Sequence, residues 1–300
     1  MSTNEPNRLA WLALAVVCIV WGTTFLGIRI GVHYLPPLFF TLTRLTLAGT
    51  IFLMVYSGRI RWRLLTPKIL LLHLATGSVL FSIGVGLVGI AEVTISGGLA
   101  AVIASMIPVW VICINLLINR TERPTAGVIV GILIGLTGIF LIYGEHHGFS
   151  LTGNLSGILL MFLAGIGWAT GTVWIKRYSA TSEATGAGGF QLLFGGMVLI
   201  PFSLFTEDWS TVNVGSEVII VIAYMVLIGS VFSFFCYLYA LKHLPLTIVS
   251  TYAYVNPVVA VVLGWLLLDE KLNARIILGM VVTLAGVFMV NRGFRGVSGK

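Results

Sequence analysis

Two apolar stretches of the sequence carry the same polar pattern. VWGTTFLGIRIG occupies residues 20–31, and GWATGTVWIKRY occupies residues 167–178. Aromatic rings often wall small-molecule sites, and polar groups beside them offer hydrogen bonds to a ligand. The alternative is that the glycines and threonines only let helices pack closely. The residues that these stretches contribute to the predicted substrate-binding site are Trp21, Thr23, Thr24 and Trp168.

Three cations lie within or at the ends of apolar runs. Arg29 and Lys176 each follow the tryptophan of their stretch by eight residues, and their long side chains suit helix ends at a membrane interface. Arg44 lies eight residues beyond Pro36, which is roughly 12 Å along a helix. A cation facing lipid at that depth is costly. We therefore expect Arg44 to point inward, either bonded to backbone carbonyls or recognising a substrate carboxylate.

Two titratable groups belong to the third apolar run. Glu92 closes the run, and a carboxylate in such a poor dielectric is suited to handling substrate charge or coupling transport to protons. The alternative is an ordinary anion of an outer loop. His73 is a lone histidine inside the run, and we expect it to be packed rather than proton-coupling.

A third polar cluster, TYAYVNP, occupies residues 251–257. Tyr252 and Asn256 are four residues apart, so they share one face of a helix, where they suit a polar ligand. Hydrogen bonds between helices are the alternative role. Pro257 removes a backbone donor and can bend its helix, and Pro108 does the same in an earlier run. Both prolines are predicted gating positions.

The composition excludes a water-soluble chain. Of the 300 residues, 58% are hydrophobic and 9% charged, with a mean hydropathy of +1.05, whereas soluble domains have about 25% charged residues. The net charge of +7 does not indicate a nucleic-acid partner, because the cations lie in short loops. Cys18, Cys113 and Cys236 fall inside apolar runs, so we expect buried thiols without disulfides.

Ten apolar runs are each close to the ~20 residues that a membrane-spanning helix needs. They are 10–30, 36–57, 69–91, 96–118, 125–143, 155–175, 187–206, 216–240, 246–267 and 274–291. Unbroken runs favour helices over barrel strands, which would alternate. The first run is too long for a signal peptide and is expected to remain as a span.

Lysine and arginine define the direction of the chain. With the N-terminus in the cytoplasm, thirteen of the 17 cations fall on the cytoplasmic side and only Lys271 and Arg275 fall outside. The thirteen are Arg8, Arg59, Arg61, Arg63, Lys68, Arg120, Arg123, Lys176, Arg177, Lys242, Arg292, Arg295 and Lys300. Because such residues accumulate in cytoplasmic loops, both termini are predicted to be cytoplasmic.

The two halves of the chain repeat each other. An offset of 147 pairs Trp21 with Trp168, Arg29 with Lys176 and Arg44 with Gln191. Offsets of 148 and 149 pair Glu122 with Glu270, Gly131 with Gly279, Gly138 with Gly286, Ala91 with Ala240 and Pro108 with Pro257. Such offsets indicate two homologous halves, here 10–143 and 155–291. Five spans in each half make the repeats inverted, which is typical of secondary transporters with a substrate site near the midplane.

Several stretches resemble the EamA family of the drug/metabolite transporter superfamily, and most closely its YedA-type branch of bacterial inner-membrane permeases. They are VWGTTFLGIRIG with PPLFFTLTRLTLAG, AEVTISGGLAAVIASMIPVW (91–110) and YALKHLPLTIVSTYAYVNPVVAVVLGWLLLDEKL (239–272). The resemblance implies an all-α integral membrane fold. Its ten transmembrane helices form two inverted five-helix repeats around a central cavity. It also implies location in the bacterial inner membrane and outward movement of small metabolites, often amino acids.

Together, these patterns predict a secondary transporter, not an enzyme, that exports amino acids or related compounds by alternating access. We expect a small-molecule substrate and the lipid bilayer as partners, with no cofactor, metal or nucleic acid. Proton coupling stays open. GxxxG spacing at Gly127, Gly131 and Gly135 allows close packing either within the chain or across a homodimer. The alternatives are a membrane enzyme acting on a lipid-linked substrate, a channel, or a transporter of sugars, nucleosides or drugs.

Overall fold

The computed structural model describes residues 8–60, 62–118, 126–147, 155–178, 184–212, 214–270 and 272–295, and the regular structure in these ranges is helical throughout. The α-helices are α1 (Arg8–Tyr34), α2 (Pro37–Tyr56), α3 (Pro67–Gly77), α4 (Gly86–Ala91), α5 (Gly97–Ala104), α6 (Ile107–Ile118), α7 (Ala126–His147), α8 (Leu155–Tyr178), α9 (Ala184–Thr206), α10 (Ser216–Val226), α11 (Ser233–His243), α12 (Leu246–Val249), α13 (Tyr252–Leu268) and α14 (Ala274–Arg295). Two π-helical segments are η3 (Ser78–Ile83) and η5 (Leu227–Phe232). Short 3-10 turns are η1 (Ser57–Arg59), η2 (Trp62–Leu64) and η4 (Trp209–Thr211).

Helices are the expected form for an apolar chain of this kind, because hydrocarbon offers no partner for backbone N–H and C=O groups. Seven helical segments are long and apolar enough to cross a membrane: 8–34, 37–56, 67–91, 97–115, 155–178, 187–206 and 216–243. Shorter apolar helices cover 126–142, 252–268 and 274–290. The all-helical membrane class is confirmed, and the ten crossings stay a prediction.

Several charged residues that the sequence patterns use lie outside the described residues. Both chain ends lie outside the described residues, as do Arg61, Glu122, Lys271, Lys300 and the two arginines at 120 and 123. The cytoplasmic location of both termini therefore also stays a prediction.

Four of the predicted spans are interrupted rather than continuous. The third is broken by η3 and the eighth by η5, and these two π-helical segments lie 149 residues apart at both ends. The fourth breaks between α5 and α6, just before Pro108, and the ninth breaks between α12 and α13. Pro257 lies inside α13 rather than at a break. Because π-helical turns often occur at functional sites, the paired segments η3 and η5 mark where a site is expected.

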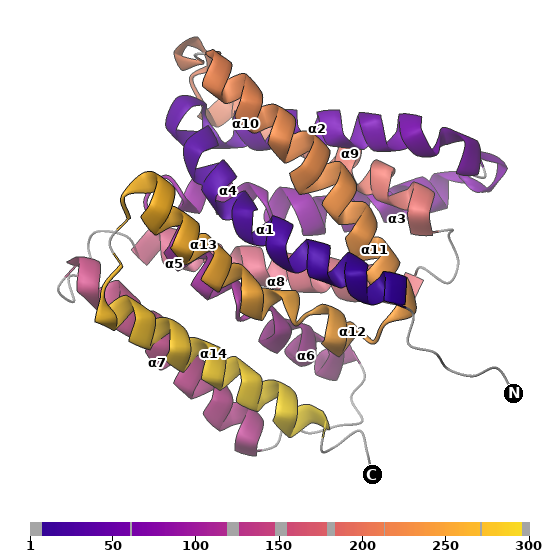
Figure 1. The fold of residues 1–300 in the computed structure, drawn as a ribbon. Helices are drawn as coiled ribbons and strands as arrows, with labels where there is room; N and C mark the ends of the chain where they lie inside the picture. The colour runs from indigo at the N-terminus through magenta and orange to yellow at the C-terminus, as the bar shows by residue number, and fades with distance from the viewer. Residues whose placement is uncertain are drawn as a thin grey trace, which may run out of the picture.

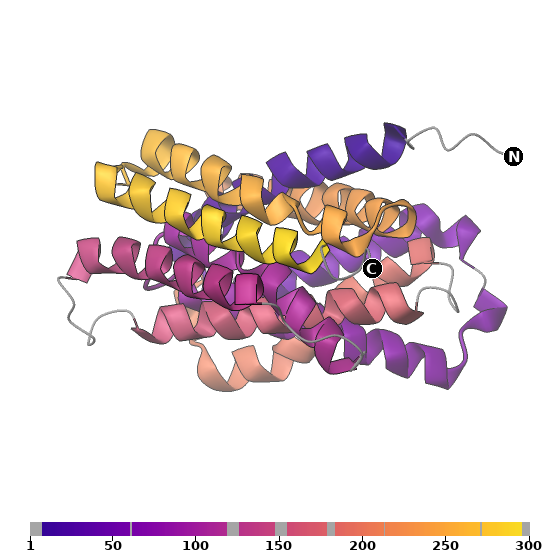
Figure 2. The ribbon, with the colours of Figure 1, turned by 90° about the horizontal axis from the view of Figure 1, so that it is seen from below.

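Helices from the two halves pack against each other in pairs. The most extensive contacts join α7 with α14 and α2 with α9, while α1 lies against α11 and α13. Figures 1 and 2 show α7 and α14 side by side along their length. A Cβ atom added at Gly138 would come within 2.5 Å of the Gly279 carbonyl oxygen. The glycine spacing of α7 therefore serves contact with α14, within the chain. The homodimer stays a prediction.

Candidate substrate cavity

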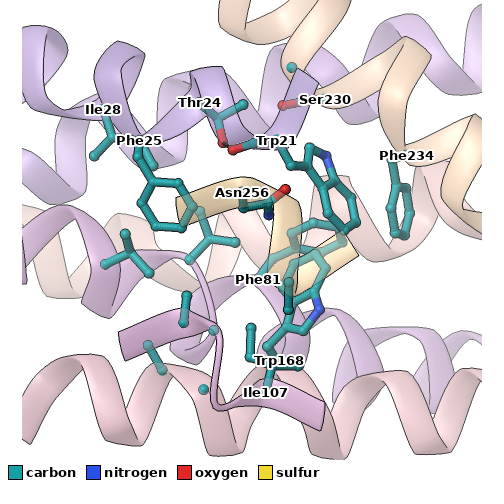
Figure 3. Close-up of a pocket in the computed structure, with 18 of the residues that line it drawn as sticks. Trp21, Thr24, Phe25, Ile28, Phe81, Ile107, Trp168, Ser230, Phe234 and Asn256 are labelled. Carbon is teal, nitrogen blue, oxygen red and sulfur yellow. Dashed lines mark hydrogen bonds between the residues drawn. The ribbon is translucent and has the colours of Figure 1, made fainter. Parts of the chain in front are cut away.

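A cavity of about 90 Å³ lies where helices of both halves meet. Its lining comprises Trp21, Thr24, Phe25, Ile28, Arg44, Phe81, Gly84, Val85, Val88, Ala104, Ile107, Met161, Ala164, Gly165, Trp168, Leu192, Gly229, Ser230, Phe234, Tyr252, Ala253 and Asn256. Figure 3 shows the aromatic side chains and the few polar ones converging on it. Both π-helical segments contribute, η3 through Phe81 and η5 through Gly229 and Ser230.

Six of the eight residues predicted at the substrate site line this cavity. They are Trp21, Thr24, Arg44, Trp168, Tyr252 and Asn256. Thr23 and Glu92 are not in the lining. The Thr23 hydroxyl instead meets the Tyr224 hydroxyl of α10 and donates to the Val20 carbonyl at 2.6 Å. The six come from α1, α2, α8 and α13, so side chains far apart in the sequence are brought together.

The two repeat-matched tryptophans touch at the cavity wall. The ring centroids of Trp21 and Trp168 are 5.0 Å apart with an interplanar angle of 89°, an edge-to-face contact that aromatic pairs favour. Trp21 also contacts Tyr237 at 4.8 Å and Tyr252 at 4.9 Å between centroids. Its indole nitrogen donates to Ser233 Oγ at 2.8 Å. The ring of Trp21 is therefore held on several sides and presents a fixed surface to a ligand.

Arg44 extends from α2 to the π-helical segment η5. Its Nε donates to Ser230 Oγ at 2.8 Å, and its Nη2 donates to the Gly229 carbonyl at 3.4 Å. Nη1 is buried and makes no hydrogen bond to any of the described residues. The expected inward direction of Arg44 is thus observed, with bonds to backbone and hydroxyl oxygens. The same geometry leaves one buried guanidinium nitrogen, Nη1, without a partner among the described residues.

Tyr252 and Asn256 lie on the same face of α13, as their spacing predicts, and both line the cavity. With its amide nitrogen turned toward α1, Asn256 donates to the Cys18 carbonyl at 2.9 Å and to the Tyr252 carbonyl at 3.0 Å. These bonds tie α13 to α1. Asn256 therefore joins two walls of the cavity as well as lining it.

Arg29 and Lys176 occupy equivalent places in the two halves. Arg29 Nη1 donates to the carbonyl of Glu92, at the end of α4. Lys176 Nζ donates to the carbonyls of Leu241 and Leu244, at the end of α11. Each cation thus satisfies free carbonyls at a helix C-terminus, where positive charge is favourable. The matched spacing in the sequence reflects this shared helix-capping role.

Glu92 is fully buried, and within the described ranges neither of its carboxylate oxygens has a hydrogen-bond partner. A buried carboxylate that lacks a partner is costly unless it is protonated or neutralised. Two other acidic residues have clear capping roles across the halves. Glu207 accepts from the Leu38 and Phe39 amides at 2.6 and 2.8 Å, and Glu270 accepts from the Gly97 amide at 3.3 Å. Glu92 is therefore different in kind from these structural carboxylates.

The sequence prediction missed several residues of the site. Ser230 and Gly229 hold Arg44, and Tyr237 is buried beside Trp21, with its hydroxyl 2.7 Å from the Thr172 hydroxyl. All three lie within the apolar run 216–240, which looks like an uninterrupted helix in the sequence. The only available signal was the pair of small residues at 229–230 within that run.

These features define a class of protein: a multi-pass helical membrane protein with an internal small-molecule cavity built by both halves of the chain. The chain belongs to the EamA-like transporter family, whose model matches residues 8–144 and again 155–292. It is accordingly a multi-pass membrane transporter.

Individual relatives agree with this assignment. The chain is 33% identical to the inner membrane transporter YedA of Escherichia coli (strain K12), over 94% of this chain and 90% of that protein. It is 28% identical to a transporter of Archaeoglobus fulgidus, over 94% and 98%. It is 26% identical to a WAT1-related chloroplast protein of Arabidopsis thaliana, over 97% and 71%. A crystal structure that is 18% identical matches with a TM-score of 0.68 over 93% of this chain and 95% of the other, which shows a shared fold.

Proposed function

We propose that the chain is a secondary transporter that works by alternating access between two inverted five-helix repeats, 10–143 and 155–291. In this proposal ten helices cross the membrane and both termini are cytoplasmic. The substrate site is the cavity between the halves, and the cargo is an amino acid or a related small metabolite that moves outward. The resemblance to bacterial inner-membrane permeases supports the cargo and the direction.

The observation that carries the proposal is the contact between Trp21 and Trp168 at the cavity wall. These residues hold the same position in the two halves of the sequence. When both halves contribute matching residues to one site, movement of either half can open the site. Alternating access requires this, because the site must open to one side of the membrane and then to the other. An enzyme acting on a lipid-linked substrate has no need for such a matched pair.

Glu92 is the proposed proton-coupling group. It is buried, its carboxylate has no hydrogen-bond partner in the part of the chain that the structure describes, and the Arg29 guanidinium lies against its backbone carbonyl. A carboxylate in this position can change protonation as access to water changes. In this proposal a proton enters as substrate leaves.

Counterflow in proteoliposomes tests the proposal. Vesicles containing the purified protein are loaded with a mixture of neutral and aromatic amino acids, and labelled tracer is added outside. A carrier accumulates tracer transiently without any other driving force, whereas an enzyme would convert it. Repeating the assay with an imposed pH gradient tests the coupling.

The matched control for the cavity is Trp265, which is 50% exposed on α13 and lies outside the lining. Accumulation should disappear in Trp21→Ala and in Trp168→Ala but persist in Trp265→Ala. If no amino acid accumulates, the proposed cargo is wrong and sugars, nucleosides and drug-like cations are tested next. If no compound of any class exchanges, alternating-access transport itself is overturned.

A further inference from the structure

We propose that the cavity selects its substrate by an anionic group, so that its ligands are small carboxylates with an apolar or aromatic body. An ammonium group is not part of what the cavity recognises. This inference rests on the proposed function and names its substrate class. Amino acids would then bind through their carboxylate and side chain alone.

The anionic group is assigned to the free nitrogen of Arg44. Arg44 is only 6% exposed and lines the cavity. Ser230 and Gly229 occupy its Nε and Nη2, which fixes the plane of the guanidinium group. Nη1 has no partner. A guanidinium held in this way can donate to a carboxylate oxygen without first losing side-chain freedom.

The charge of Arg44 also lacks a bonded counter-ion. In the described part of the chain, its hydrogen bonds go to a hydroxyl and a backbone carbonyl, both of them neutral groups. Glu92 is close enough to act on Arg44 electrostatically, but its own oxygens make no hydrogen bond and it is not in the lining. A buried cation without a bonded anion is unfavourable. An anionic ligand would relieve this cost, and a neutral or cationic ligand would not.

The remaining lining offers nothing to pair with an ammonium group. Among the described residues, no aspartate or glutamate lines the cavity, and Arg44 is its one charged side chain. The walls are aromatic or aliphatic, with Phe25, Phe81 and the two tryptophans on several sides (Figure 3). Apolar walls with one cation complement a ligand that is apolar except for one anionic end.

The size of the cavity limits the apolar body. A water needs roughly 10–15 Å³ of such a volume, so the cavity of about 90 Å³ holds on the order of six to nine waters. A ligand that replaces them occupies roughly 180–270 Å³, at about 30 Å³ per water. A single benzene ring with a short carboxylate chain fits this space.

Four compounds that share a phenyl ring and a two-carbon chain separate the alternatives: 3-phenylpropanoate, 3-phenylpropanamide, phenylalanine and 2-phenylethylamine. Their affinities are measured by calorimetry at pH 7 on the purified, detergent-solubilised protein. We expect 3-phenylpropanoate to bind at least tenfold more tightly than the amide, because a hydrogen bond between two charged groups is stronger than one to a neutral acceptor. Phenylalanine should bind no more tightly than 3-phenylpropanoate, and 2-phenylethylamine should bind most weakly.

Arg44→Gln is the matching variant, because the chain itself carries a buried glutamine, Gln191, at the equivalent position of the second half. In this variant the preference for acid over amide should vanish while amide binding is kept. Arg177→Gln, at an exposed position near the end of α8, is the control and should keep the full preference. If Arg44→Gln does not fold, Ser230→Ala, which removes the acceptor for Nε, should reduce the preference.

The affinities of the four compounds for the unmodified protein test the preference for an anionic group even without variants. Equal binding of acid and amide overturns the inference, as does tightest binding by the amine. Binding of phenylalanine tenfold or more above 3-phenylpropanoate overturns it too, as does the absence of binding by all four. Because binding is measured without transport, a preference for the acid would stand even if counterflow failed. Counterflow of an uncharged compound, by contrast, would keep the transporter and overturn this substrate class.

Discussion

The contact between α7 and α14 allows one prediction to be worked out from distances. A Cβ atom at Gly286 would lie 2.3 Å from the Gly135 amide nitrogen and 2.6 Å from the Gly131 carbonyl oxygen. Both are backbone atoms inside α7, so no change of side-chain rotamer relieves the overlap. Gly286→Ala must therefore force the two helices apart.

The cost follows from the distance that the helices must move. The optimal distance between non-bonded heavy atoms is about 3.5–4.0 Å. To relieve the overlap, α7 and α14 must therefore move apart locally by roughly 1 Å. A gap of that size forfeits about a quarter to a half of each dispersion contact along the interface. Overpacking typically costs about 1–3 kcal/mol, and we expect Gly286→Ala at the upper end, ~3 kcal/mol. With ~2–4 °C per kcal/mol, the melting temperature should fall by roughly 6–12 °C.

The assay is the thermal stability of the purified protein in detergent, followed as the monodisperse fraction on size-exclusion chromatography after heating. Gly58→Ala is the matched control, because a Cβ atom there meets nothing within 4 Å and should leave the melting temperature unchanged. An unchanged melting temperature in Gly286→Ala would refute this packing of α7 on α14. A loss of dimer mass without a loss of stability would instead assign the glycine spacing to a homodimer.

Three further predictions follow from the cavity and its surroundings. Trp21→Phe should keep measurable counterflow while Trp21→Ala abolishes it, because the phenyl ring retains part of the cavity wall; equal rates in the two variants would argue against an aromatic wall. Glu92→Gln should keep counterflow but remove its response to an imposed pH gradient, and a response that persists would exclude Glu92 as the coupling group. Glu207→Gln should lower stability by about 1–2 kcal/mol, since it removes a charged acceptor from the amides that begin α2; an unchanged melting temperature would show that this cap contributes little.

The sequence predicted the walls of the cavity because the walls are repeated. Trp21 and Trp168 occur at matching positions of two homologous halves, so their shared environment could be inferred without any knowledge of the fold. The TYAYVNP cluster was predictable for a different reason. Two polar residues four apart on a helix share a face whatever the helix packs against.

The role of Thr23 could not be separated from that of Thr24 by residue type. Both are hydroxyls beside a tryptophan, but a helix turns by 100° per residue. Thr24 is three residues beyond Trp21 and lies near its face, where it lines the cavity. Thr23 is two residues beyond Trp21 and faces away, toward Tyr224. Helical geometry, applied more strictly to the sequence, would have distinguished them.

The π-helical segments were beyond the reach of hydropathy. A π-helical turn accommodates one extra residue while keeping the chain apolar, so η3 and η5 look like ordinary parts of long runs. Their effect is nevertheless decisive for the site. The η5 segment turns the Gly229 carbonyl and the Ser230 hydroxyl toward Arg44. The partners of Arg44 therefore came from the structure alone.

The departure from symmetry is as informative as the symmetry itself. Arg29 and Lys176 cap helix ends in the same way in both halves, and Trp21 and Trp168 wall the same cavity. These matched residues supply scaffold and shape. Arg44 and Gln191 also hold matching positions, but only Arg44 lines the cavity with a charge, while Gln191 is buried outside the lining. A ligand of the proposed class has one anionic end, so a second cation in the cavity would remain unpaired. The proposed selection for one anionic group would account for an arginine at this position in one half and a neutral amide in the other.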